Sequence, residues 1–174
     1  MSNTLFSGKA YVTGDNTSSY LLSYPSRWKE CKADPELLGE WLFEPLVPEF
    51  EGKPSAFKAL GYKVLVSGVD LGGGFKSNDD PALTVKGGGI ELVVADDINR
   101  IFFRNCINLG IPIISCPGVS KIVNDGDIIS GDIATGIIKN ETTGETIQGE
   151  PLSELSVDII QSGGLIPYWK NRIG

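Results

Sequence analysis

Runs of branched apolar residues, separated by turn residues, divide the chain into a succession of strands and helices. In the first two thirds of the chain, runs typical of buried strands occupy residues 9–12, 63–68, 91–95 and 111–116. Helices are predicted at residues 34–43, 81–86 and 97–109. Because strands alternate with helices from residue 63 to 116, this part predicts a βαβ unit with parallel strands and right-handed crossovers.

Two of these helices carry recognisable ends. Asp34 precedes Pro35, which places an N-cap side chain before a proline at the first helical position. Gly110 follows the helix at 97–109 in the position of a C-cap. The segment 44–61 contains three prolines and is predicted to be irregular.

The last third of the chain has a different pattern. Short strands are predicted at residues 127–129, 135–138 and 146–147. The composition of residues 140–144 predicts a hairpin turn, and a last amphipathic helix is expected from Ser153 to about Ser162. The fold class is therefore α/β, with a small βαβ core and a β-rich lobe. We expect a single domain over residues 1–174, a length that suits one domain.

The composition is that of a globular protein, with 41% hydrophobic and 21% charged residues. No apolar run approaches the about 18 residues that a membrane span needs, so no membrane partner is expected. The N-terminal residues lack the pattern of a secretory signal, which favours a cytoplasmic protein. The net charge is −7 and the basic residues form no stripe, so we expect no nucleic-acid partner.

The chain contains no histidine, which excludes Ser-His-Asp and Cys-His catalysis and the commonest metal ligand. The three cysteines, Cys31, Cys106 and Cys116, have neither a zinc-site spacing nor an even count. We expect them to be reduced and buried as small apolar residues. No metal or other cofactor is therefore predicted in this chain.

Several segments follow one another in a distinctive order. They are GKA and GDN at 8–16, PSRW at 25–28, DPEL and LFE at 34–44, IFFRNCINLGIP at 101–112, and a tail formed by 140–144, 163–166 and Tyr168. Together they resemble the small subunit of 3-isopropylmalate dehydratase, a member of the aconitase swivel-domain family. The block at 101–112 is the most specific, and the resemblance covers almost the whole chain.

This resemblance implies an aconitase-type swivelling β/β/α domain. In the working family the domain caps a large subunit that carries a [4Fe–4S] cluster, so that cofactor is expected only if such a partner exists. The pair moves a hydroxyl group by dehydrating and rehydrating a dicarboxylic acid. The small subunit contributes a GxGSSRE loop, in which a serine acts as base and an arginine grips a substrate carboxylate.

The corresponding loop of this chain, residues 72–79, departs from that pattern. Its glycines are present, but Phe75 and Lys76 replace the two serines, Ser77 replaces the arginine and Asn78 replaces the glutamate. A phenyl ring cannot accept a proton, and a serine cannot clamp a carboxylate with two parallel charged hydrogen bonds. The acidic DTD element of the family corresponds to residues 18–20, which here are Ser-Ser-Tyr. The resemblance thus implies a pocket changed from a dicarboxylate site towards a neutral or apolar one.

The two departing segments supply the candidate site residues. The candidate catalytic donors are Lys76, Ser77, Asn78 and Tyr20, and the candidate substrate-binding residues are Gly73, Gly74, Phe75, Ser18, Ser19 and Arg27. Structural alternatives stay open for each kind. Phe75 can pack within the loop, Lys76 can be solvated, and Arg27 can be a structural contact. The hydroxyl groups at 18–20 can serve turn chemistry alone.

Three functions fit these observations. The first is a repurposed lyase or isomerase that catalyses an isomerisation, dehydration or cyclisation of a small molecule without the iron–sulfur subunit, alone or as a homodimer. The second is a divergent small subunit of a hydro-lyase, paired with a large aconitase-like subunit and acting on a dicarboxylate. The third is a non-catalytic homologue. The sequence favours the first, because the loop has lost both the base and the carboxylate clamp.

Overall fold

The computed structural model describes residues 4–74 and 78–173, and the described strands form one sheet in the order β4-β3-β2-β1-β5-β6-β7. The strands are β1 Leu5–Val12, β2 Val64–Ser67, β3 Leu92–Ala95, β4 Ile113–Ser115, β5 Ile128–Asp132, β6 Ile137–Asn140 and β7 Thr146–Gln148. The α-helices are α1 Ser19–Leu22, α2 Pro25–Cys31, α3 Pro35–Gly39, α4 Asp80–Gly87, α5 Arg100–Asn108, α6 Glu154–Gln161 and α7 Leu165–Ile173. Short 3₁₀ turns are η1 Pro48–Phe50, η2 Lys58–Leu60 and η3 Val119–Lys121.

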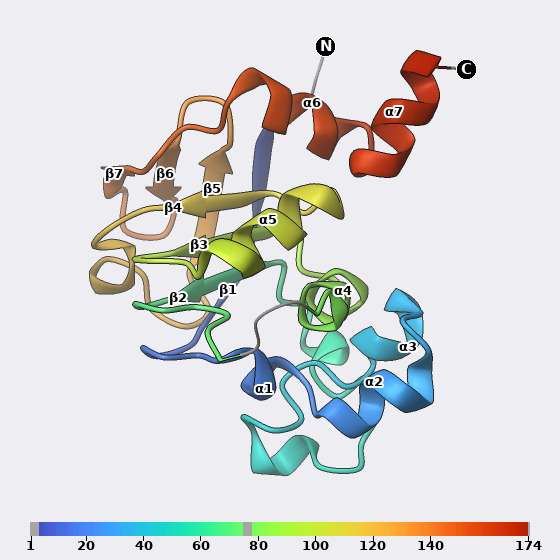
Figure 1. Cartoon of the computed structure of the whole chain (residues 1–174). Coiled ribbons are helices and arrows are strands. Elements are labelled where there is room, and N and C mark those ends of the chain that lie inside the picture. The colour runs from blue at the N-terminus through green and yellow to red at the C-terminus, as the bar shows by residue number, and fades with distance from the viewer. Residues whose placement is uncertain (1–3, 75–77, 174) are drawn as a thin grey trace.

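Strand β1 joins two halves of this sheet (Figure 1). Its carboxyl half pairs in parallel with β2, and its amino half pairs in antiparallel fashion with β5. Strands β3 and β4 extend the parallel half, whereas β6 and β7 extend the antiparallel half. The predicted βαβ core and β-rich lobe are thus two halves of one sheet, joined by a single long strand.

The parallel strands are buried on both faces. In β2, Leu65 packs into one apolar cluster, whereas Val64 and Val66 pack into a second. Strand β3 alternates in the same way, because Val93 belongs to the first cluster and Val94 to the second. Full burial of such a side chain contributes about 1.5–3 kcal/mol. Burial on both faces explains why these strands appear in the sequence as continuous apolar runs.

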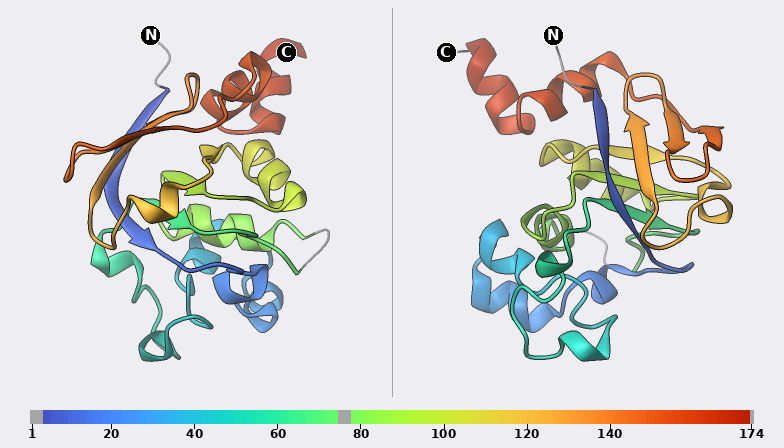
Figure 2. Two further views of the ribbon diagram at one scale, coloured as in Figure 1. Left: turned by 90° about the vertical axis from the view of Figure 1, so that its left-hand side faces the viewer. Right: turned by 180° about the vertical axis from the view of Figure 1, so that it is seen from behind.

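The helices are distributed unevenly around the sheet. Figures 1 and 2 show α1, α2 and α3 gathered at one end of the molecule, with α6 and α7 at the other. None of the helices in the described part of the chain is long and apolar enough to cross a membrane.

The predicted helix at 34–43 proved too long, since α3 ends at Gly39. Asp34 caps it as predicted, because its side chain accepts two backbone N–H groups at 2.9 and 3.4 Å. Gly39 lies directly against α4, where a Cβ atom on Gly39 would stand 1.9 Å from the carbonyl carbon of Gly87. Beyond this close approach the chain forms tight turns, and Phe43 takes a left-handed φ of 62° that no α-helix can continue.

Three helices were not predicted from the sequence. Helix α2 begins at Pro25, which stands at the first helical position and does not interrupt the helix. Helix α7 carries Pro167 in its first turn, where a missing N–H is tolerated. The helix expected to be the last, which is α6, is therefore followed by another. The four-residue helix α1 is too short to show any period in the sequence.

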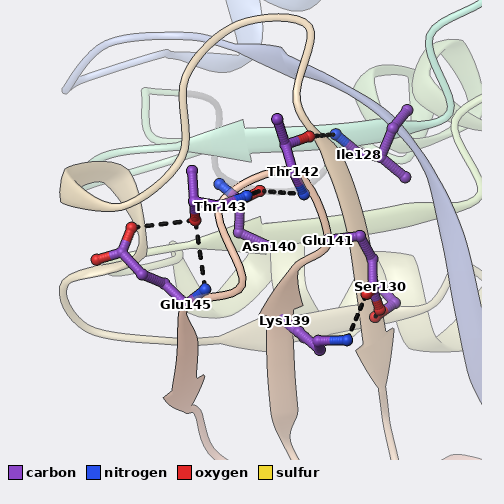
Figure 3. A network of polar contacts seen from close by, with 8 residues as sticks. All are labelled: Ile128, Ser130, Lys139, Asn140, Glu141, Thr142, Thr143 and Glu145. Atoms are coloured by element: carbon purple, nitrogen blue, oxygen red, sulfur yellow. Dashed lines mark hydrogen bonds and ion pairs between the residues drawn. The ribbon is translucent and has the colours of Figure 1, made fainter.

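The predicted hairpin turn at 140–144 is confirmed, and a buried amide organises it. Asn140 is fully buried, and its side-chain oxygen accepts the N–H groups of Thr142 and Thr143 at 3.0 and 3.2 Å. Its side-chain nitrogen donates to the Ile122 carbonyl and to Asp127. Figure 3 shows how the turn residues close around this amide. The turn is thus held by side-chain bonds as well as by strand pairing.

Candidate functional site

The candidate site lies where the parallel strands end. The carboxyl ends of β1, β2 and β3 meet at one edge of the sheet, and each is followed by a loop. We call residues 13–18 the first loop, 68–79 the second loop and 96–99 the third loop. In open α/β sheets this edge is where ligands bind, because backbone and side-chain groups of several loops converge there.

Hydrogen bonds join the first loop to the first residues of the second loop. The N–H of Asn16 donates to the Val69 carbonyl at 2.8 Å, and the N–H of Val69 donates to the Asp15 carboxylate at 3.0 Å. Further along, the N–H of Gly72 donates to the Thr17 carbonyl at 2.8 Å. The two segments predicted to contact substrate are therefore neighbours in space, although more than 50 residues separate them in the chain.

Ser19 completes this junction from the start of α1. Its hydroxyl donates to the Gly72 carbonyl at 2.8 Å, and its N–H donates to the Gly73 carbonyl at 2.9 Å. Only 2% of Ser19 is exposed, so its hydroxyl is occupied in holding the second loop. Ser19 therefore acts as a structural contact between the loops, and the substrate-binding role predicted for it stays a prediction.

Gly72 is the point at which only a glycine fits. Its φ is 78°, in the left-handed region, and a Cβ atom there would lie 2.3 Å from Cγ of Phe102 on α5. The third loop supports the same segment, since the N–H of Leu71 donates to the Asp97 carbonyl and the N–H of Asn99 donates to the Leu71 carbonyl. The first residues of the second loop are thus fixed on two sides.

Ser18, Tyr20 and Gly74 come together at the surface end of this junction. A Cβ atom on Gly74 would lie 3.6 Å from Cδ2 of Tyr20 and 3.7 Å from Cβ of Ser18. Gly74 is exposed and Ser18 is half-buried, while 41% of Tyr20 is exposed. These three predicted residues are accessible to a ligand. Gly73 is buried beside the Asp70 carboxylate and offers only its backbone.

Asn78 stands at the other end of the second loop. Its side-chain oxygen accepts the N–H of Asp80 at 3.2 Å, and its carbonyl accepts a hydrogen bond from the Asn105 side chain on α5 at 3.1 Å. These bonds fix the start of α4. Burial raises the pKa of the Asp80 carboxyl, which lies in the first turn of that helix. The catalytic role predicted for Asn78 stays a prediction, because these contacts are structural.

Arg27 lies on α2 and has its own set of partners. It forms two parallel hydrogen bonds with the Glu44 carboxylate, at 3.0 and 2.8 Å, and a third with Glu30 at 2.9 Å. Its guanidinium also stacks on the Trp41 ring, with the centroid 3.6 Å away. The hydrogen bond from Arg27 lowers the pKa of the buried Glu44 carboxyl. Among the described residues these contacts are structural, and the substrate-binding role predicted for Arg27 stays a prediction.

Three of the predicted site residues, Phe75, Lys76 and Ser77, lie outside the described residues. Their roles as pocket wall, cation and hydroxyl donor stay predictions. In the described ranges, 4–74 and 78–173, no group of three or more cysteine, aspartate or glutamate side chains could hold a metal ion.

The cysteines are buried and unpaired, as expected. Burial raises the pKa of Cys106 far above its ordinary range and raises that of Cys116 to about 11. At neutral pH both are thiols, which are poor nucleophiles compared with thiolates.

One supporting network was not found from the sequence. The Trp28 indole N–H donates to the Ser23 hydroxyl at 2.6 Å, which lies 3.1 Å from the Thr84 hydroxyl. Thr84 donates in turn to the Asp80 carbonyl at 2.7 Å, and its side chain is fully buried. This chain of bonds connects α2 to the start of α4. In the sequence, hydroxyl residues next to helices look the same whether they form a buried network of this kind or lie on the surface.

The fold and the converging loops define a class of protein, the aconitase-type swivel domain. The crystal structure of a 3-isopropylmalate dehydratase chain from Methanocaldococcus jannaschii superimposes with a TM-score of 0.81, at 27% identity, over 97% of this chain and 95% of that one. No protein-family model matches the sequence.

Curated relatives identify the family. The chain is 42% identical to the 3-isopropylmalate dehydratase small subunit of Pyrobaculum aerophilum over 94% of its length and 96% of that protein. It is 39% identical to the protein of the same description from Pyrobaculum calidifontis, over 97% of its length and 99% of that protein. It is also 35% identical to the isopropylmalate/citramalate isomerase small subunit of Methanocaldococcus jannaschii, over 98% and 96% of the two chains. The chain belongs to the family of 3-isopropylmalate dehydratase small subunits, and the swivel-domain expectation is confirmed.

Proposed function

We propose that this chain is the small subunit of a two-chain hydro-lyase that isomerises a hydroxy acid. Relatives called small subunits match it along nearly its whole length, and that observation carries the proposal. It favours a subunit that works with a large aconitase-type chain over the self-sufficient enzyme that the loop sequence alone suggested. The [4Fe–4S] cluster expected in such enzymes belongs to the large chain in this proposal.

The part played by this chain is to position the substrate. The first and second loops are joined to one another, so the backbone at Gly74, the Cβ atom of Ser18 and the ring of Tyr20 lie together at one preformed surface. Lys76 supplies the cation of the second loop and can bind a carboxylate as a point charge. A preformed surface lowers the barrier because orientation is settled before the reaction begins.

Helix α7 offers a surface that suits a protein partner. Ile166, Trp169 and Ile173 are exposed by 69%, 50% and 80%, and they lie near one another on one side of the helix. Exposed contiguous apolar side chains on a globular protein commonly mark an interaction site. Because the relatives are described as small subunits, we take the large subunit to be the chain that covers this face.

Association with the large subunit tests the proposal. A tagged chain co-expressed with the isopropylmalate dehydratase large subunit of the same organism should co-elute with it in size-exclusion chromatography. The double substitution Ile166→Ser and Trp169→Ser should weaken this co-elution. The control Leu37→Ser removes a similarly exposed apolar side chain on α3 and should leave it intact. Separate elution of the two unaltered chains would contradict the proposal.

A second candidate is an enzyme that acts without a large subunit. The observation that favours it is the loop Gly74-Phe75-Lys76-Ser77-Asn78, which lacks the serine pair and the arginine expected from the family resemblance. Its test is substrate turnover by the purified chain alone. Conversion in the absence of any second chain would favour this candidate.

We also place the complex in the cytoplasm. The three cysteines are buried and free, which suits a reducing compartment.

A further inference from the structure

Helices α5 and α7 differ in charge from the rest of this acidic chain. The chain has 22 acidic and 15 basic residues, yet α5 carries Arg100 and Arg104 and no acidic residue. Helix α7 carries Lys170 and Arg172 and likewise no acidic residue. Each of the other described α-helices that carries a charge includes at least one aspartate or glutamate. Positive charge is therefore concentrated on these two helices.

The two arginines of α5 lie on its outer side. They are four residues apart, so they are neighbours on the helix surface, and both are exposed. The opposite side of the helix is buried through Phe102 and Cys106. In the described part of the chain, neither guanidinium forms an ion pair, a hydrogen bond or a contact with an aromatic ring. Both charges therefore face solvent unpaired.

Helix α7 continues this surface with apolar side chains. It contacts α5 and lies on the same side of the sheet (Figure 2). Its exposed residues Ile166, Trp169 and Ile173 line one hollow together with Lys170. Arg172 lies 3.5 Å from Asp158, but Lys170 has no ion pair with any described residue. The two helices thus place an apolar area beside three unpaired cations.

Such a surface suits a protein partner that has both apolar groups and negative charge. Apolar contacts at the centre of an interface supply affinity, whereas opposite charges at its rim speed the encounter of the two proteins. Two copies of this chain would repel one another, because each has a net charge of −7. The large subunit of the proposed function is the partner that remains.

We infer, on the basis of the proposed function, that α5 and α7 form one docking surface for the large subunit. The large subunit presents an acidic rim to Arg100, Arg104 and Lys170, and an apolar area to the exposed side of α7. This assignment goes beyond the proposed function, because it extends the contact to α5 and states the charge of the surface that binds there.

Association kinetics of the full chain with the separately purified large subunit test this inference. The double substitution Arg100→Glu and Arg104→Glu should lower the association rate constant by about tenfold or more at low ionic strength. The difference should shrink at high ionic strength, because salt screens exposed charges, and the dissociation rate should change far less. Arg100→Gln with Arg104→Gln should give a rate constant between those of the reversed pair and the unaltered chain.

The matched control is Lys32→Glu with Lys53→Glu, which changes the net charge by the same amount. Both lysines are exposed, and they lie after α2 and in the irregular segment after α3. This control should associate at close to the rate of the unaltered chain. Equal rates for the reversed arginine pair and the unaltered chain, or equal slowing by the control, would overturn the inference and leave the proposed function standing. Self-association of this chain that the reversed pair abolishes, with association to the large subunit unaffected, would assign the surface to a second copy and also overturn it. No association between the unaltered chains would contradict the proposed function itself, and the inference with it.

Discussion

At the scale of single residues, the glycines of the second loop show what the sequence can and cannot reveal. The run Gly72-Gly73-Gly74 indicates a backbone that turns tightly, and Gly72 and Gly74 do have positive φ values. The neighbour that makes Gly72 indispensable, Phe102, stands 30 residues later, and no local pattern connects the two. Ser18 and Ser19 are adjacent and chemically alike, yet only Ser19 is buried, and its hydroxyl donates to the Gly72 carbonyl inside the junction of the two loops.

Gly72→Ala should destabilise the protein by about 2–4 kcal/mol, because it adds both left-handed strain and overlap with Phe102. Gly52→Ala is the control, since Gly52 has a φ of 67° and no heavy atom within 4 Å of an added Cβ. It should cost only about 1–2 kcal/mol of backbone strain. Urea unfolding of the two variants measures the difference, and equal losses would contradict the packing at Gly72.

Glu44 should make stability depend on acid pH. Its pKa lies below the ordinary value of 4.5, chiefly because Arg27 donates to it. Its charged form therefore contributes stability that is fully present above pH 4.5 and is lost as the pH falls through the lowered pKa. Glu44→Gln should cost about 2 kcal/mol at pH 7 and flatten the acid limb of stability against pH. The control Glu36→Gln removes an exposed carboxylate that lies 3.5 Å from Lys58, and it should cost much less stability at pH 7.

At the scale of elements, the sequence predicted those strands and helix ends that are specified by residues next to one another in the chain. The strands β2 and β3 appeared as apolar runs because both faces are buried, and Asp34-Pro35 marked the start of α3. Helix α2 was not predicted, because Pro25 stands in a mostly polar stretch, whereas its position at the first turn permits a helix. The close contact of Gly39 with Gly87, which ends α3, depends on a partner helix far away in the sequence.

The bond chain from Trp28 to Asp80 should stabilise the start of α4. Thr84→Val removes the buried hydroxyl that links Ser23 to the Asp80 carbonyl, and leaving these groups unpaired should cost about 1–3 kcal/mol. Thr84→Ser retains the hydroxyl and should cost less. Hydrogen exchange of the α4 amides measures the effect, and equal exchange in the two variants would show that the hydroxyl is not what holds this helix.

At the scale of the whole molecule, the long strand β1 accounts for the architecture. It unites a parallel half, whose strand ends carry the candidate site, with an antiparallel half that contributes no candidate site residue. The sequence predicted both halves and the two loops that meet. It did not predict the exposed apolar side of α7, because the helix itself was not expected. The two-chain enzyme proposed above is supported by small-subunit relatives that match nearly the whole chain, and by that surface.

Substitutions of the loop residues Lys76 and Ser77 distinguish a catalytic subunit from a non-catalytic one. In a catalytic complex, Lys76→Ala should lower kcat/KM for a carboxylate substrate by about tenfold or more, since it removes the only cation of the second loop. Lys29→Ala, an exposed lysine on α2, is the control. Unchanged kinetics in both Lys76→Ala and Ser77→Ala would favour a non-catalytic homologue.

The most direct test of a two-chain hydro-lyase is reconstitution of activity from separately purified chains. Turnover of C2-substituted malates should be absent with this chain alone, absent with the anaerobically prepared large subunit alone, and restored when the two are mixed. Activity should saturate at one copy of this chain per large subunit. Turnover by this chain alone, or by the large subunit without it, would contradict the account.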